Sequence, residues 1–387
     1  MKRKEKKKGQ QLTTAALSVV SVVLALCCLS IRLPDILSAN ENTISLFAAG
    51  LVLPQGGRAL GEKDRDNVSS SLEAGNASSE AGEPQGGEHS SSPAESSQAS
   101  SKSDSSGESS SKEEGKSTSS TPKKNEKKFG IIEMQFGASG MNYNNFYIKN
   151  ATGTTLDVKK ELQKTPDVKI KKNGEPQVLI MHTHTCESFM DEDLGYYYES
   201  FYSRNTDNKY NVTQVGDAIE AKLKAAGIGV IHDTTKHDDP SYNGSYNRAR
   251  NTIQKNLKKY PSIQVVLDIH RDGLMKDTKE KIKPTCVIDG QKAAQIMIIS
   301  GCDTDGSLAF PDWEYNLRLA LRLQQSAENM YPGITRPLYF SQTKYNMDMT
   351  HGSLLIEVGS DSNTLQEAVR TGGYLGDILV DVLNGLT

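Results

Sequence analysis

The stretch QVLIMHTHTCES, residues 177–188, carries side chains that can bind a metal ion. Its first five residues predict a short strand, after which the chain presents His182, His184 and Glu187 within six residues. An imidazole and a carboxylate three residues apart on a turn can converge on one cation. Zinc accepts nitrogen and oxygen ligands, and a catalytic zinc takes three protein ligands and leaves one position open. The stretch therefore predicts two zinc ligands, Glu187 and either His182 or His184.

The third ligand is expected from a second strand end. His270 closes the apolar run 263–269, so strand order can bring it to the first two ligands. Glu357 interrupts the apolar stretch SLLIEVG, residues 353–359. A carboxylate in a buried strand is costly unless it is used, and burial raises its pKa toward the range of a general base. We predict that Glu357 transfers protons; the alternative is a solvated glutamate at a sheet edge.

Other side chains near these stretches are candidates for supporting roles. Asp268 would hydrogen-bond a ligand imidazole or cap a neighbouring loop. Arg271 would pair with a substrate carboxylate or form an ordinary salt bridge. His351 precedes the last predicted strand and would stabilise an oxyanion or be solvated. His232 and His237 flank an aspartate run and give a weaker indication of a second cation.

A thiol nucleophile is the competing chemistry, because Cys186 lies among the histidines. No third group that would orient it is evident in the sequence, and a metal explains the glutamates better. Beyond the N-terminal stretch the chain has Cys186, Cys286 and Cys302, an odd number that implies no disulfide framework.

Strands and helices are expected to alternate from about residue 129 onward. This pattern predicts a mixed, mainly parallel α/β sheet flanked by helices on both faces, with the site at the carboxyl ends of the strands. The expected strands are 130–136, 145–149, 177–181, 229–232, 263–269, 285–289, 295–300 and 353–359, and the expected helices are 156–163, 211–226, 246–259, 313–331 and 363–383.

The N-terminal third has a different composition. A basic segment precedes an uncharged apolar run long enough to cross a bilayer, which predicts a single-pass cell-membrane protein with a cytoplasmic N-terminus and an extracytoplasmic domain. A signal peptide cleaved near residues 37–39 is the alternative. The predicted parts are a basic tail (1–11), a transmembrane anchor (12–31), a juxtamembrane segment (32–61), a disordered Ser/Glu/Gly/Lys-rich tether (62–128) and a catalytic domain (129–387).

Charge argues against nucleic acid as a ligand. The 387 residues carry a formal net charge of −3, and the lysines cluster near the N-terminus and in the tether. No glycine-rich phosphate loop precedes a predicted helix.

Several motifs occur in the order found in a known family. They are HTHTCES, YNGSYNRARNTIQKNLKKYPSIQVVLDIHRD, YPGITRP and HGSLLIEVGSDSNTLQEAVR. Together they resemble the stage II sporulation protein P family, over roughly Gly130 to the C-terminus, and the predicted anchor and tether fit this resemblance.

The resemblance implies a zinc-dependent N-acetylmuramoyl-L-alanine amidase. Such enzymes cut the amide between stem peptide and muramic acid in peptidoglycan, and this family is also associated with cutting cross-links. Its implied partners during engulfment of the forespore are stage II sporulation proteins D and M. By position, His184 with its alternative His182, then Glu187 and His270, match the metal site, and Glu357 matches the catalytic carboxylate. A zinc peptidase that cuts only cross-links and a non-catalytic wall-binding protein are the alternatives.

Overall fold

The computed structural model describes residues 125–387, which form two sheets and five helices together with short 3₁₀ turns. The larger sheet has the order β2-β3-β11-β10-β12-β7-β4-β6, and the smaller one β5-β1-β8-β9. The strands are β1 Lys128–Met134, β2 Met141–Tyr143, β3 Phe146–Asn150, β4 Pro176–Met181, β5 Tyr196–Tyr198, β6 Gly229–His232, β7 Val265–Asp272, β8 Lys281–Ile288, β9 Gln291–Ala294, β10 Ile296–Gly301, β11 Leu338–Ser341 and β12 Gly352–Ser360; the helices are α3 Val158–Gln163, α4 Thr213–Ala225, α5 Ser245–Lys259, α6 Trp313–Met330 and α7 Leu365–Asn384.

The larger sheet is mixed and mainly parallel, as predicted. Strands β12, β7, β4 and β6 run parallel to one another, and β10 pairs antiparallel with β12. On the far side, β11 is parallel to both β10 and β3. The carboxyl ends of β4, β7 and β12 therefore meet at one edge of the sheet.

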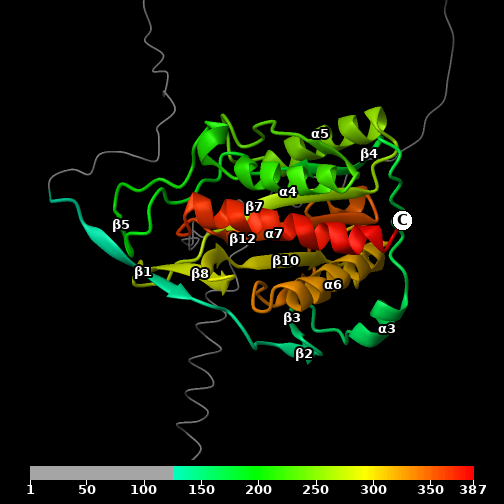
Figure 1. The fold of residues 1–387 in the computed structure, drawn as a ribbon, viewed down its shortest axis with the longest axis horizontal. Helices are drawn as coiled ribbons and strands as arrows, with labels where there is room; N and C mark the ends of the chain where they lie inside the picture. The colour runs from blue at the N-terminus through cyan, green and yellow to red at the C-terminus, as the bar shows by residue number, and fades with distance from the viewer. Residues whose placement is uncertain (1–124) are drawn as a thin grey trace, which may run out of the picture. The chain divides into compact units, whose positions relative to one another are not determined.

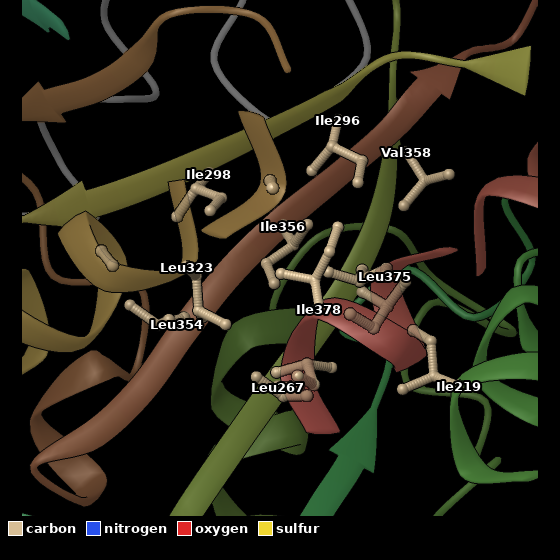
Figure 2. Packing of buried hydrophobic residues seen from close by; sticks show 14 of the residues in the cluster. Ile219, Leu267, Ile296, Ile298, Leu323, Leu354, Ile356, Val358, Leu375 and Ile378 are labelled. Atoms are coloured by element: carbon tan, nitrogen blue, oxygen red, sulfur yellow. The ribbon is translucent and has the colours of Figure 1, made fainter. Parts of the chain in front are cut away.

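Helices cover both faces of this sheet, which agrees with the predicted α/β class. Helices α4, α7 and α6 lie side by side across one face (Figure 1). Alternate strand residues such as Leu267 and Ile356 point into this layer and meet Ile219, Leu375 and Ile378 of the helices (Figure 2). The intervening residues face the other way; those of β4 and β7 pack with α5 in a second apolar cluster, made of Leu179, Met181, Ala249, Ile253, Ile263 and Val266.

The smaller sheet was not predicted. Its strand β8 makes polar contacts with α7 and with the end of β12. Lys283 of β8 is fully buried, with its Nζ 2.8 Å from Glu367 Oε1 of α7 and 3.0 Å from Asp193 Oδ1. The Ser360 and Ser362 hydroxyls, just past Glu357 in sequence, both donate to the Ile282 carbonyl of the same strand. The smaller sheet thus supports the turn between β12 and α7.

The predicted membrane localisation is wrong on the evidence of residues 125–387. No helix in this part of the chain combines the length and apolarity needed to cross a bilayer. The predicted anchor, residues 12–31, lies outside the described residues, as do the basic tail, the juxtamembrane segment and all but the last four residues of the predicted tether.

Candidate metal centre

Four of the predicted site residues come together at the carboxyl edge of the larger sheet. His270 near the end of β7 is the cross-strand partner of Glu357 on β12. His184 and Glu187 lie in the turn after β4, the strand on the other side of β7. The ring centroids of His184 and His270 are 5.4 Å apart, and Glu187 Oε2 lies 3.4 Å from His270 Nδ1.

All four side chains are buried, and three of them lack hydrogen bonds that buried polar groups normally make; the fourth, Glu187, accepts one from the Arg271 backbone N–H. Each is at most 1% exposed. Both ring nitrogens of His184 and of His270, and Oε2 of Glu357, have no hydrogen-bond partner. Orphaned buried polar atoms are rare in native proteins and often mark a bound ion or a catalytic role. Two imidazoles and a carboxylate are a donor set that zinc prefers, so the types of residue present fit that ion.

The protonation states of His184 and Glu187 also suit the binding of a cation. Burial lowers the pKa of His184 to about 3, so its ring is neutral and offers a lone pair. Burial opposes ionisation of Glu187, but Arg271, followed by His270, lowers the pKa of the carboxyl to about 2. A neutral imidazole and an ionised carboxylate are the forms that coordinate metals.

Glu357 has the opposite tendency. Burial raises its pKa well above the ordinary 4.5, and the nearby Asp272 carboxylate raises it further. Asp272 itself is buried and paired with Arg336, whose Nη1 donates to Asp272 Oδ2 at 2.8 Å. A carboxyl that binds protons readily beside a cluster of potential ligands matches the environment expected of a general acid and base.

Asp268 connects the two strand ends that carry the cluster. Its Oδ1 accepts from the Thr183 backbone N–H and its Oδ2 from the Thr183 hydroxyl, each at 2.7 Å. Asp268 Oδ1 also lies 2.9 Å from His270 Nε2, at ion-pair distance but without hydrogen-bond angles. Asp268 therefore holds the turn after β4 and leaves His270 Nδ1 on the side of Glu187.

The structure separates the two histidines that the sequence left as alternatives. Val178, Ile180 and His182 alternate onto the α4 face of the sheet, whereas His270 projects from the other face. Both ring nitrogens of His182 are engaged, Nδ1 with the Ile269 carbonyl at 2.8 Å and Nε2 with His232 Nε2 at 2.9 Å. Of these two histidines, His184 in the turn is the one whose ring nitrogens have no hydrogen-bond partner.

The other two candidates, Arg271 and His351, are engaged in other contacts. Arg271 is buried, and its guanidinium donates to the Ser188 and Ser203 carbonyls, so it braces the loop that carries Glu187 instead of facing substrate. His351 precedes the first residue of β12 and is therefore at the opposite edge of the sheet, with its Nδ1 2.6 Å from Asp167 Oδ2.

Cys186 is unsuited to nucleophilic attack. Its side chain is buried, and burial followed by the Asp238 carboxylate raises the pKa of the thiol to about 12. The group is therefore a neutral thiol at physiological pH, and the nucleophile is the thiolate.

Two tyrosines at the site were not predicted from the sequence. Tyr242 stacks on the His184 ring with centroids 4.3 Å apart, and Tyr246 stacks against His270 at 6.5 Å. Both phenol oxygens are buried without a hydrogen-bond partner. The only sequence signal was their spacing of four residues across the start of α5, which places both near one end of the helix.

The described residues form an α/β protein with a buried histidine and carboxylate cluster at the carboxyl ends of parallel strands. A family model described as "Stage II sporulation protein P (SpoIIP)" matches residues 63–380. The chain therefore belongs to the stage II sporulation protein P family, as its motifs predict. It is 27% identical over 216 residues to "Stage II sporulation protein P" of Bacillus subtilis (strain 168), which is 53% of this chain and 50% of the relative. The chain thus spans about half the length of that curated relative.

Solved structures that it resembles are more distant. The CwlD amidase from Clostridioides difficile in complex with the GerS lipoprotein has 12% identity and a TM-score of 0.32, over 54% of this chain and 96% of that one. An N-acetylmuramoyl-L-alanine amidase from Clostridium difficile 630 has 15% identity and a TM-score of 0.31, over 55% of this chain and 97% of that one.

Proposed function

We propose that this chain is a zinc-dependent peptidoglycan hydrolase, an N-acetylmuramoyl-L-alanine amidase that acts in forespore engulfment. The observation that carries the proposal is the buried set of His184, Glu187, His270 and Glu357, whose imidazole nitrogens and Glu357 Oε2 lack hydrogen bonds. Such a set is costly to fold unless it is used. Membership of the stage II sporulation protein P family supports the choice of substrate.

His184, Glu187 and His270 would hold the zinc ion. When bound, zinc would supply Lewis acidity to the scissile carbonyl and to the attacking water. His270 would use Nδ1, the nitrogen beside Glu187, because Nε2 faces Asp268. Asp268 would keep the ring in this orientation.

Glu357 would move the proton. Its carboxyl lies beside His270 in the strand register and carries one oxygen without a partner. It would accept a proton from the attacking water and donate it to the amide nitrogen as the bond to muramic acid breaks. General acid and base transfer of this kind accounts for about 10²- to 10⁴-fold of rate.

Access to the cluster requires movement of Tyr242. His184 is only 1% exposed and lies under the Tyr242 ring, so a glycan strand cannot reach it in this conformation. Tyr242 precedes α5 in an exposed stretch, where Ser241, Asn243 and Gly244 face solvent. Once Tyr242 is displaced, its phenol and that of Tyr246 would be available as hydrogen-bond donors to the substrate.

The test is digestion of purified sacculi by the full chain, after removal of metal by a chelator and again after addition of zinc. Mass spectrometry of the soluble products should find intact stem peptides freed from glycan, and only with zinc present. Glu357→Gln should reduce this release about 10²- to 10⁴-fold while the far-UV circular dichroism is unchanged. Release of cut cross-links alone would identify a peptidase, and binding without release would identify a non-catalytic wall protein; either result contradicts the amidase proposal.

The partnership with stage II sporulation proteins D and M is part of this proposal. It rests on the family resemblance, and co-purification of the full chain with each protein tests it.

A further inference from the structure

A second group of potential ligands lies on the opposite face of the larger sheet. Asp217 and Glu220 are three residues apart on α4, so they project from one side of the helix. His232 ends β6, which α4 covers. One ligand atom of each residue lies within 4.8 Å of the other two, the only such histidine, cysteine and carboxylate group among residues 125–387.

Proton positions in this group follow from its hydrogen bonds. The Ile269 carbonyl can only accept, so His182 Nδ1, 2.8 Å away, carries a hydrogen. His182 is fully buried with no carboxylate among its hydrogen-bond partners, so it is neutral and its Nε2 is an acceptor. His232 Nε2, at 2.9 Å, must then donate to it. A neutral His232 is left with a lone pair on Nδ1.

That lone pair points at a carboxylate. His232 Nδ1 lies 3.0 Å from Asp217 Oδ1. Two acceptors at this distance repel one another unless a cation lies between or beside them. The His232 side chain is only 4% exposed, whereas that of Asp217 is 54% exposed. A metal ion satisfies both atoms without a charged imidazole.

Helix α4 is shaped to accommodate the histidine pair. Gly216 lies inside the helix, where glycine costs about 1 kcal/mol relative to alanine. A Cβ at this position would overlap His232 Nε2 and lie 3.0 Å from His182 Nε2. The glycine therefore provides the space in which the two imidazoles meet.

The group is open to solvent on the side of the carboxylates. The Asp217 side chain is 54% exposed, and Gln214 Nε2 donates to its Oδ2 at 3.0 Å, which leaves Oδ1 for the ligand role. Glu220 Oε1 is 2.7 Å from the Nζ of Lys224, whose side chain is 56% exposed and can move away. An ion from solution can therefore reach the group.

We propose that Asp217, Glu220 and His232 bind a second divalent metal ion of the zinc type. One imidazole nitrogen, two carboxylates and a water molecule are a coordination set suited to such an ion. The ion fixes His232 and, through it, the hydrogen-bonded link from His182 to the Ile269 carbonyl. Since the next residue is His270, the second ion braces the strand that carries the candidate active site. The site is independent of the proposed amidase activity.

Zinc titration of the chelator-treated full chain by calorimetry tests the proposal. We compare His184→Ala with the double variant His184→Ala/Asp217→Asn, so that the first candidate site is disabled in both. The single variant should bind one zinc ion, and the added Asp217→Asn should weaken that binding more than about tenfold. Asp277→Asn, at another exposed aspartate, is the matched control and should change nothing. Equal zinc binding with Asp217→Asn and Asp277→Asn overturns the proposal.

Lys224→Met gives a change of the opposite sign. Removal of the competing ammonium should tighten zinc binding by roughly two- to fivefold, as expected for one exposed ion pair. Zinc should also raise the melting temperature of His184→Ala but not of the double variant. If Lys224→Met binds zinc no more tightly, by calorimetry or by the shift in melting temperature, the assigned ligands are contradicted. No readout uses peptidoglycan, so failure of the amidase proposal leaves this test intact.

Discussion

The close packing of α7 on α4 can be tested by two adjacent glycines of α7. Gly372 faces α4: a Cβ there would lie 2.8 Å from the Val215 carbonyl oxygen and 3.1 Å from Ala218 Cβ. Gly373 faces away, with its nearest neighbour the Lys222 Cε at 4.0 Å. Either change to alanine favours the helix by about 1 kcal/mol. Only Gly372→Ala also forces two helices apart.

The magnitudes separate the two variants clearly. Overpacking of this kind costs about 1–3 kcal/mol, because a backbone oxygen cannot move aside as a side chain can. Gly373→Ala should therefore raise the free energy of unfolding by up to about 1 kcal/mol, while Gly372→Ala should change it by between zero and about 2 kcal/mol in the destabilising direction. Urea denaturation of the full chain, followed by circular dichroism at the helix band, measures both.

The refuting result is equal stabilisation by the two substitutions. It would mean that α4 and α7 are not in contact at this point. The contact matters for the site because α4 begins just after Val212, whose N–H donates to the Glu187 carbonyl. A shift of α4 would thus be transmitted to the loop that carries Glu187.

Three further outcomes are expected. Asp268→Asn should weaken zinc binding about 10- to 100-fold in a chelator competition assay, and unchanged affinity would contradict its positioning role. Cys186→Ala should keep full release of stem peptides from sacculi, since the pKa of about 12 makes the thiol inert; lost release would revive the thiol mechanism. Burial raises the pKa of the Glu161 carboxyl, but hydrogen bonds from Lys164 and Arg318 outweigh this effect and lower the pKa below 4.5. Its stabilisation should be full above pH 4.5 and disappear as pH falls through the lowered pKa, so the melting-temperature difference from Glu161→Gln should shrink in acid.

The strands that carry the candidate site were predictable because each is a short apolar run that stops at a polar residue. β4, β7 and β12 were all placed within a few residues of their observed bounds. The smaller sheet was not predictable in the same way. Its β1 pairs in parallel with β8, about 150 residues later, and β5 and β9 are short and partly exposed. Such pairings depend on long-range packing, which local periodicity does not report.

Strand geometry explains which of the candidate residues lie together in the structure and which lie apart. Side chains alternate between the faces of a sheet, so the sequence alone could have placed His182 with Ile180, on the face away from His270. Strand direction likewise puts His351, which precedes β12, at the edge opposite Glu357. Tyr242 could not be predicted, because its ring reaches His184 from a loop of polar residues without periodicity.

The same limit applies to the second group of ligands. His232 drew attention for the aspartates near it in sequence, yet its partner in space is Asp217 of the preceding helix. His237, the other histidine of that prediction, is held by the His182 carbonyl and the Thr252 hydroxyl. Neighbours in sequence were a poor guide here, because a helix and a strand bring together residues 15 positions apart.

The ammonium of Lys283 has a consequence for how this molecule can change. It faces Glu367, Asp193 and, at 3.6 Å, Glu133, so one positive charge serves three carboxylates from different segments. Glu133 and Asp193 also pair with Lys292, but the buried Glu367 does not. Replacing Lys283 alone would leave the Glu367 carboxylate buried without its ion pair, whereas replacing both residues by apolar ones would not. Variation at these two positions is therefore expected to be concerted. The turn that follows Glu357 is hydrogen-bonded to β8, the strand that carries Lys283. Substitutions at Lys283 or Glu367 that shift β8 would therefore change the orientation of the Glu357 carboxyl group.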